Sequence, residues 1–159
     1  MAKELARLRP SIMRRSFGVG ALVALGLLLI YIAVVRPPQH IGWQLFLIVF
    51  GGLVLWGGSA MWRASQIALV LTEETLATET GEVIATVENI RSADRSFFAF
   101  KPSNGFLLRL KTPGSRAWSP GIWWRLGKSV GVGGVTHAPD AKYMAEVLTA
   151  LIAERDSKS

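Results

Sequence analysis

Few residues in this chain have the chemistry needed for catalysis. Of its two histidines, only His137 lies outside the short link between two apolar stretches. A nucleophile activated by histidine would require His137 together with Asp94 or Asp140. Asp140 stands where a helix is expected to begin, and aspartate ordinarily caps the backbone at such a position. We therefore expect no enzymatic activity, and keep a membrane-bound enzyme using His137 as a third hypothesis.

Metal and nucleotide sites are not expected either. The chain has no cysteine and its two histidines are far apart, so the usual zinc ligand sets are missing. Gly-Lys-Ser at 127–129 looks like the end of a P-loop, but Ile122 occupies the position of the leading glycine. The glycines of residues 131–134 begin like a dinucleotide fingerprint, whose third glycine position is Thr136 here. We predict no cofactor.

Two uncharged stretches, residues 17–35 and 41–61, dominate the organisation of the chain. They are 19 and 21 residues long, and a helix of about 20 apolar residues crosses ~30 Å of hydrocarbon. The link between them contains Pro37 and Pro38, which disfavour helix. Neither stretch contains Asp, Glu, Lys, Arg or His, which argues against ion or proton transport. The stretches predict a two-helix transmembrane hairpin over residues 17–61.

Basic residues predict the orientation of this hairpin. Five Lys or Arg residues precede the first stretch, whereas the link holds only Arg36. The positive-inside rule therefore places both termini in the cytoplasm, and we predict a multi-pass membrane protein; the family resemblance described below implies that this membrane is the bacterial inner membrane. Residues 1–16 are interpreted as a basic cytoplasmic tail, which could lie partly as an interfacial helix because Leu5, Leu8 and Ile12 have helical spacing. A cleaved signal peptide fits less well, because the apolar core of a signal is shorter.

Small residues recur at helical spacing along both stretches and would allow backbones to approach closely. They are Gly20 and Ala24 in the first stretch, and Gly51, Gly52, Gly58 and Ser59 in the second. The sequence leaves two roles open for these faces. They serve packing within the hairpin, or docking onto another membrane protein or a second copy of the chain.

Residues 65–156 are predicted to form a small cytoplasmic domain. Asn104-Gly105 is its strongest turn signal, and Pro113-Gly114 and Gly127-Lys128 are also read as turns between strands. Apolar residues at helical spacing over 141–155 predict an amphipathic helix that covers the core. Runs rich in β-branched and aromatic residues predict about seven strands, at 65–71, 75–80, 83–87, 90–100, 106–112, 122–126 and 129–135.

Four segments of this domain carry a resemblance to a known family. They are Leu-Val-Leu-Thr-Glu-Glu-Thr-Leu at 69–76, Val-Glu-Asn-Ile at 87–90, Ser-Val-Gly-Val-Gly-Gly at 129–134 and the helix at 141–155. With the apolar hairpin ahead of them, they resemble the bacterial pleckstrin-homology-like (PH-like) membrane proteins. The resemblance implies an α+β membrane protein: an N-terminal transmembrane α-hairpin, then a PH-like antiparallel β-domain capped by a C-terminal α-helix. Related domains bind phosphoinositides, peptides or proteins, so the fold does not select a ligand.

Residues 91–128 are strongly basic, with eight Lys or Arg side chains against a single acid and a net charge of +7. The eight are Arg91, Arg95, Lys101, Arg109, Lys111, Arg116, Arg125 and Lys128. If the strands gather them, they form a patch for anionic lipid headgroups or an acidic partner. The alternative is a solvated sheet face that balances the glutamates of residues 73–88. Nucleic-acid binding is not expected, because residues 64–159 together carry only +1.

Three tryptophans, Trp118, Trp123 and Trp124, lie close together beside a proline-glycine turn. Such aromatics favour the lipid headgroup region or a protein interface. Trp123 and Trp124 are adjacent and should point to opposite faces of a strand, so one of them is expected in the core. Together these observations predict a non-enzymatic scaffold or accessory subunit that binds another membrane protein. The alternative is a peripheral module that senses anionic lipid.

Overall fold

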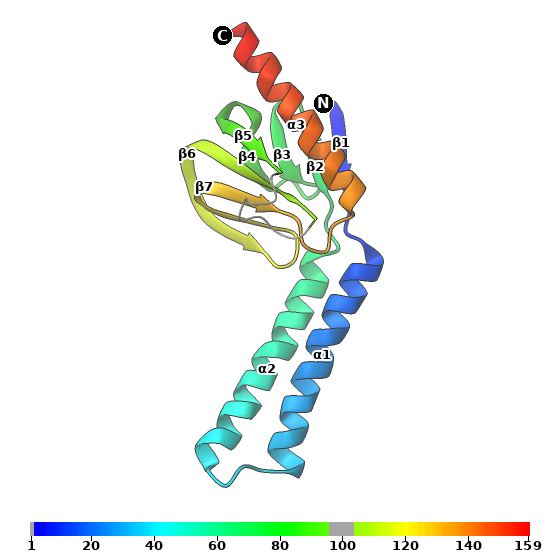
Figure 1. The fold of residues 1–159 in the computed structure, drawn as a ribbon, viewed down its shortest axis with the longest axis vertical. Helices are drawn as coiled ribbons and strands as arrows, with labels where there is room; N and C mark the ends of the chain where they lie inside the picture. Colours follow the sequence, from blue (N-terminus) through cyan, green and yellow to red (C-terminus); the bar gives the residue numbers. More distant parts are fainter. Residues whose placement is uncertain (1, 96–103) are drawn as a thin grey trace. The chain divides into compact units, whose positions relative to one another are not determined.

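The computed structural model describes residues 2–95 and 104–159. The chain forms two compact units, of which Ile12–Arg63 is helical and Met1–Ser11 together with Ala64–Ser159 contains all the described strands (Figure 1). The predicted α+β layout is confirmed: two long apolar helices, two antiparallel sheets and a C-terminal helix. We call the second unit the β-domain.

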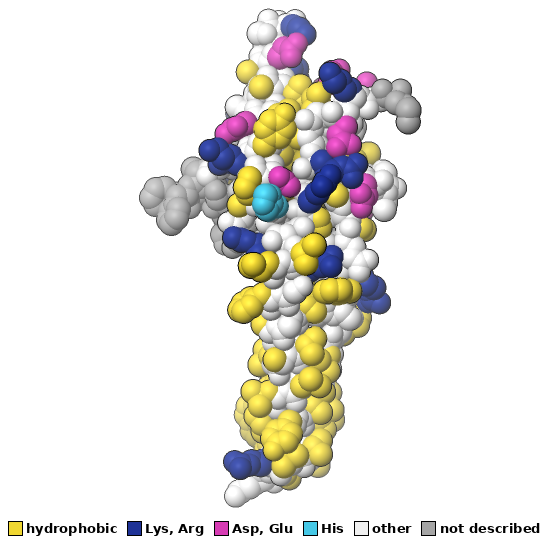
Figure 2. All heavy atoms as spheres, turned by 90° about the vertical axis from the view of Figure 1, so that its right-hand side faces the viewer, with side chains coloured by type: hydrophobic (Ala, Val, Ile, Leu, Met, Phe, Trp, Pro, Cys, Tyr) yellow, Lys and Arg dark blue, Asp and Glu magenta, His cyan; other side chains and the backbone are white. Residues whose placement is uncertain are grey.

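The helical unit consists of α1 (Ile12–Val35) and α2 (Ile41–Ala64), each 24 residues long. At ~1.5 Å per residue such a helix is about 36 Å long, enough to cross ~30 Å of hydrocarbon. Their most apolar windows have mean hydropathies of 2.7 and 1.8, and only 11% of each window is buried. In the face shown in Figure 2, hydrophobic side chains cover these helices. Both helices could therefore span a membrane, as the sequence predicts.

The β-domain contains a sheet of four strands and a sheet of three. The first has the order β1 (Glu4–Leu8), β2 (Leu69–Thr72), β3 (Thr75–Thr78) and β4 (Val83–Thr86). A short 3-10 helix, η1 (Val87–Asn89), leads to the second sheet, whose order is β5 (Ile90–Asp94), β6 (Phe106–Ser119) and β7 (Trp123–Val132). All neighbouring strands are antiparallel.

The N-terminal tail differs from its prediction. Residues 4–8 are a strand paired with β2, and not part of an interfacial helix. The reason is burial on one side, because Ala6 and Leu8 enter the core of the β-domain while Arg7 stays outside and pairs with Glu79. The amide of Ser11 also donates to the carbonyl of Val135. The tail is thus the first strand of the β-domain, although two long helices separate it from the rest.

The β6–β7 hairpin also differs from its prediction. Gly114 and Gly127, taken as turn residues, pair with each other inside long strands, where the register shifts. Gly127 has a φ of +59°, a conformation that glycine adopts at no steric cost, so β7 bends where a turn was expected. The hairpin turn is at residues 120–122. Its tip is fixed to the segment after β7, because the amides of Gly133 and Val135 donate to the carbonyls of Ile122 and Gly121 at 2.8 and 2.9 Å.

The predicted C-terminal helix is confirmed as α3 (Ala138–Lys158), three residues longer at each end than the predicted 141–155. Met144, Leu148 and Ile152 are buried, as the helical spacing requires. The helix packs against β1, η1 and β5, so it contacts both sheets (Figure 1). Strand 90–100 of the prediction is confirmed as β5 up to Asp94, and residues 96–100 lie outside the described residues.

Candidate functional site

His137 lies on the surface at the beginning of α3. Its Nδ1 is 3.1 Å from Oδ1 of Asp140, and more than half of the His137 side chain is exposed. Asp140 is in the first turn of the helix, where a carboxylate interacts favourably with the helix dipole. The part of the chain that the structure describes contains no group of three His, Cys, Asp or Glu residues that could hold a metal ion. The geometry is that of a surface pair at a helix start.

The structure separates the eight predicted basic residues into groups with different surroundings. Arg125 is held inside the β-domain: its Nη1 donates to the carbonyl of Ile84 on β4 at 2.7 Å, and its Nε to the carbonyl of Ser115 on β6 at 2.7 Å. Its Nη2 donates to the hydroxyl of Ser115 at 2.9 Å. Arg125 therefore links the two sheets, and each nitrogen of its guanidinium already donates to an acceptor within the β-domain.

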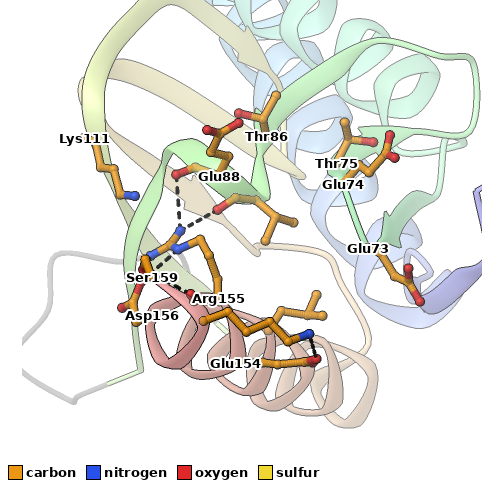
Figure 3. A pocket seen from close by; sticks show the side chains of 13 residues that line it. Glu73, Glu74, Thr75, Thr86, Glu88, Lys111, Glu154, Arg155, Asp156 and Ser159 are labelled. Atoms are coloured by element: carbon orange, nitrogen blue, oxygen red, sulfur yellow. Dashed lines mark hydrogen bonds and ion pairs between the residues drawn. The ribbon is translucent and has the colours of Figure 1, made fainter.

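Two more of the eight have acidic neighbours, and one is not described. Arg95 Nη1 lies 3.6 Å from Oε1 of Glu146 on α3, in an exposed ion pair. Lys111 shares a groove with Glu88 and other glutamates (Figure 3). Lys101 lies outside the described residues. The surroundings of Lys111 fit the alternative of charges balanced by the glutamates of residues 73–88, whereas Glu146, the partner of Arg95, is not one of these glutamates.

Four exposed basic residues remain: Arg91, Arg109, Arg116 and Lys128. Within the described ranges none of them has a carboxylate at ion-pair distance. Arg109 projects from the face of β6 opposite to the buried Leu108 and Leu110, as the alternation predicts. Arg116 and Lys128 belong to the bent hairpin near its tip. The seven described basic residues therefore differ in their surroundings, and these four are the ones exposed without a carboxylate partner.

The three tryptophans have three different environments. Trp123 is 3% exposed and belongs to the core. Trp124 is half-buried against Gly131, where a Cβ would lie 2.3 Å from Cε2 of the indole. The expectation that one of these two adjacent residues is in the core is confirmed. Trp118 pairs with Trp124 across the hairpin and is 69% exposed. Exposed Leu126 lies beside them, and the sequence analysis missed it because a lone leucine gives no signal.

The surface of the β-domain has an open groove of about 820 Å³ between the β2–β3 turn, η1 and the end of α3 (Figure 3). Arg155 crosses it, and its Nη1 donates to the carbonyls of Val87 and Ile90 at 2.8 and 2.7 Å. On its rim, Lys158 Nζ donates to Oε1 of Glu154 at 2.5 Å, and this bond lowers the pKa of Glu154. Arg155 therefore fixes the end of α3 to η1 and β5. No signal in the sequence indicates this role.

Small residues of the helical unit fall into two groups. Inside the hairpin, a Cβ on Gly51 would lie 2.9 Å from Cγ1 of Ile30 and 3.1 Å from the carbonyl oxygen of Gly26. Gly58 faces Leu22 in the same way, at 3.4 Å. Gly26 was not predicted, although Gly26 and Ala33 repeat the seven-residue spacing of Gly51 and Gly58 and are likewise buried. These residues form the contact between α1 and α2.

The other predicted small residues face outward. A Cβ on Gly20 or Gly52 would meet no atom within 4 Å among the described residues. Ala24 and Ser59 are exposed as well, and the hydroxyl of Ser59 donates to the carbonyl of Trp56 in its own helix. Gly51 and Gly58 therefore serve packing within the hairpin, whereas the other four lie on its outer surface, where docking stays a prediction.

Comparison with protein families, with curated proteins and with solved structures found no match. The functional argument therefore depends on the geometry of this chain alone.

Proposed function

We propose that this protein is a non-enzymatic integral protein of the bacterial inner membrane, with both termini cytoplasmic, that acts as a scaffold or accessory subunit. Its α1–α2 hairpin spans the bilayer and docks onto another membrane protein. Its β-domain is a PH-like module held at the cytoplasmic surface. The four-strand and three-strand antiparallel sheets and the C-terminal helix support the PH-like assignment. The β-domain is not continuous in the sequence, because its first strand, β1, precedes the α1–α2 hairpin and pairs with β2, which follows it.

Strand β1 supports the topology. Because β1 precedes α1 and pairs with β2, which follows α2, both ends of the helical unit lie on the same side of any membrane it crosses. Two helices satisfy this condition by crossing once in each direction. The excess of Lys and Arg before α1 then assigns that side to the cytoplasm by the positive-inside rule.

The observation that carries docking is the outer small-residue surface, which we define as Gly20, Ala24, Gly52 and Ser59. A lipid-facing position gains nothing from glycine, which costs roughly 1 kcal/mol relative to alanine in a helix. Small residues at helix surfaces let another helix approach closely and gain packing contacts in the bilayer. Since Gly51 and Gly58 already provide the contact within the hairpin, the outer small-residue surface fits a further helix from a partner.

The test compares two leucine substitutions on α2 in the tagged full-length protein. Gly52→Leu adds bulk to the outer small-residue surface, whereas Gly57→Leu adds the same bulk on a different face of the same helix, also in open space. After extraction in mild detergent, we expect a stoichiometric membrane protein to co-purify with the wild type and with Gly57→Leu, but not with Gly52→Leu. Equal recovery of the same co-purifying protein with the wild type and with both variants would overturn docking through this surface.

A further inference from the structure

The exposed residues at the distal part of the β6–β7 hairpin form a small amphipathic surface. Trp118 is 69% exposed and Leu126 is 53% exposed. Gly114 and Ala117 pair with Gly127 and Arg125, and the register shifts between these two pairs, so both Ser115 and Arg116 lie across from Leu126. Lys128 follows the bend at Gly127 and is also exposed. We call Arg116, Trp118, Leu126 and Lys128 the hairpin patch.

The charge of this region is one-sided. Residues 95–139 contain no Asp or Glu, so neither β6 nor β7 carries an acid that could neutralise its basic residues. Among the described residues, Arg116 and Lys128 have no carboxylate at ion-pair distance. Two other basic residues of the β-domain do have such partners, Arg7 with Glu79 and Lys158 with Glu154. The hairpin patch therefore favours an anionic occupant.

The fold does not require the exposure of Trp118. The neighbouring Trp123 already fills the core, and Trp118 is the most exposed of the large hydrophobic residues described in the β-domain. An indole with one polar N–H and a large apolar ring suits the boundary between lipid headgroups and acyl chains. Basic side chains beside it keep their charge among the phosphates while their stems lie along apolar surface.

The patch is also held in a fixed shape before any ligand binds. The hairpin tip is hydrogen-bonded to the segment after β7, and Arg125 connects β7 to β4 beneath it. The links from the β-domain to the apolar helices are short, residues 9–11 on one side and 65–68 on the other. If those helices span a bilayer, a lipid surface is always within reach of the β-domain, because four residues extend at most about 14 Å.

We propose that the hairpin patch binds the anionic surface of the bilayer, with Trp118 and Leu126 in the headgroup region and Arg116 and Lys128 on lipid phosphates. This inference rests on the proposed function, because it takes the α1–α2 hairpin as the membrane anchor. It adds a second membrane contact, which fixes the orientation of the β-domain on the lipid.

The test exploits the absence of cysteine in the chain. Trp118→Cys provides a single site for an environment-sensitive fluorophore, and Tyr143→Cys provides the control, because Tyr143 is 55% exposed on α3. Each labelled full-length protein is reconstituted into vesicles of phosphatidylcholine, with or without phosphatidylglycerol. We expect a blue shift and quenching by nitroxide-labelled lipid at position 118 in the vesicles with phosphatidylglycerol, and neither at 143.

Charge removal completes the experiment. Arg116→Gln with Lys128→Gln, in the Trp118→Cys background, should abolish most of the shift, since each basic residue near an anionic surface strengthens binding about five-fold. Arg91→Gln is the matched control outside the patch and should leave the shift unchanged. Arg91, Arg116 and Lys128 are all exposed, and near-ultraviolet circular dichroism verifies that each variant retains the fold.

Two outcomes would overturn the inference. The first is a reporter at position 118 that stays in water in both kinds of vesicle, which would exclude lipid contact of the hairpin patch. If the same protein resists alkaline extraction, the proposed membrane anchor is unaffected by that result. Release by alkaline extraction would instead contradict the anchor itself. The second outcome is a reporter at position 118 that is shielded from water only in native membranes, which would indicate a protein partner at the hairpin patch in place of lipid.

Discussion

The molecule contains two hairpins with opposite chemistry. The α1–α2 hairpin has no Asp, Glu, Lys, Arg or His over 17–35 or 41–61 and exposes hydrophobic side chains along its length. The β6–β7 hairpin has no acid, carries exposed arginine and lysine, and exposes one tryptophan. The first suits hydrocarbon and the second suits the charged boundary of a bilayer. The difference is what the two proposed membrane contacts would require, one in the hydrocarbon and one among the headgroups.

Within each hairpin, residues of one type serve two purposes. Gly51 packs against the partner helix, while the adjacent Gly52 has open space around it. Arg125 is bound to backbone carbonyls, while Arg116 in the same hairpin is exposed and without a carboxylate partner within the described chain. In both cases the position, and not the residue type, decides between stability and binding. Substitutions at these pairs should therefore have unequal effects.

The largest effect is expected from Leu8→Asp in β1. Leu8 is 1% exposed, and an unpaired carboxylate in the core costs about 4–5 kcal/mol, most of the stability of a small domain. The β-domain should become sensitive to protease while the α1–α2 hairpin stays helical and membrane-bound. Limited proteolysis of reconstituted protein, with Arg7→Gln at the adjacent half-buried position as control, measures this. Loss of both units together would contradict their independence.

Gly51→Leu should be next in size. A leucine there would collide with Ile30 and the backbone of Gly26, and overpacking of this kind costs about 2–3 kcal/mol. Gly52→Leu, one residue further along, should leave the stability of the hairpin unchanged. Denaturation of α1–α2 by sodium dodecyl sulfate, followed by circular dichroism, compares the two. Equal loss in both variants would remove the distinction between inner and outer faces.

Arg125→Ala should destabilise the β-domain by about 2–3 kcal/mol, because the carbonyls of Ile84 and Ser115 lose their donor. Arg125→Lys should recover little of this, since lysine cannot reproduce the planar set of donors. Arg116→Ala should change stability by less than about 0.5 kcal/mol. Thermal unfolding of the three variants provides the measurement, and equal midpoints for Arg125→Ala and Arg116→Ala would contradict the division between them.

The smallest effect concerns Glu154 and Lys158 at the end of α3. The hydrogen bond from Lys158 lowers the pKa of Glu154 in the folded protein. The pair therefore stabilises the fold above the unfolded pKa of glutamate, near 4.5, and this contribution is lost as the pH falls through the lower folded value. Glu154→Gln should slightly lower the unfolding midpoint at neutral pH and leave it equal to wild type in strong acid. A difference that persists in strong acid would exclude this ion pair as its cause.

The sequence predicts those elements whose signal is local and long. Two uncharged stretches and a helical period over 141–155 fix α1, α2 and α3, because each helix repeats its pattern over several turns. The sequence does not predict β1. This segment of five residues near the N-terminus becomes a strand only by pairing with β2, more than 60 positions away. Gly114 and Gly127 were likewise misread, since bulges and turns use the same residues.

For the candidate sites, the sequence gives residue types but not their surroundings. The eight basic residues are correctly marked as unusual, yet nothing local separates Arg125, which reaches a carbonyl on β4, from Arg116, which does not. Trp123 and Trp124 are separated by the alternation of a strand, which is a local signal. Leu126 and Arg155 have no such signal, because their roles depend on neighbours distant in the chain.

The most direct test of the proposed function is a photo-cross-link from the outer small-residue surface in native membranes. A photoreactive amino acid replaces Gly52 in one variant and Gly57 in another, and the adducts are identified by mass spectrometry. Docking of another membrane protein predicts one discrete protein adduct from position 52 and none from position 57. An adduct with a second copy of the chain would replace the external partner by self-association. Lipid adducts alone at both positions would contradict the account.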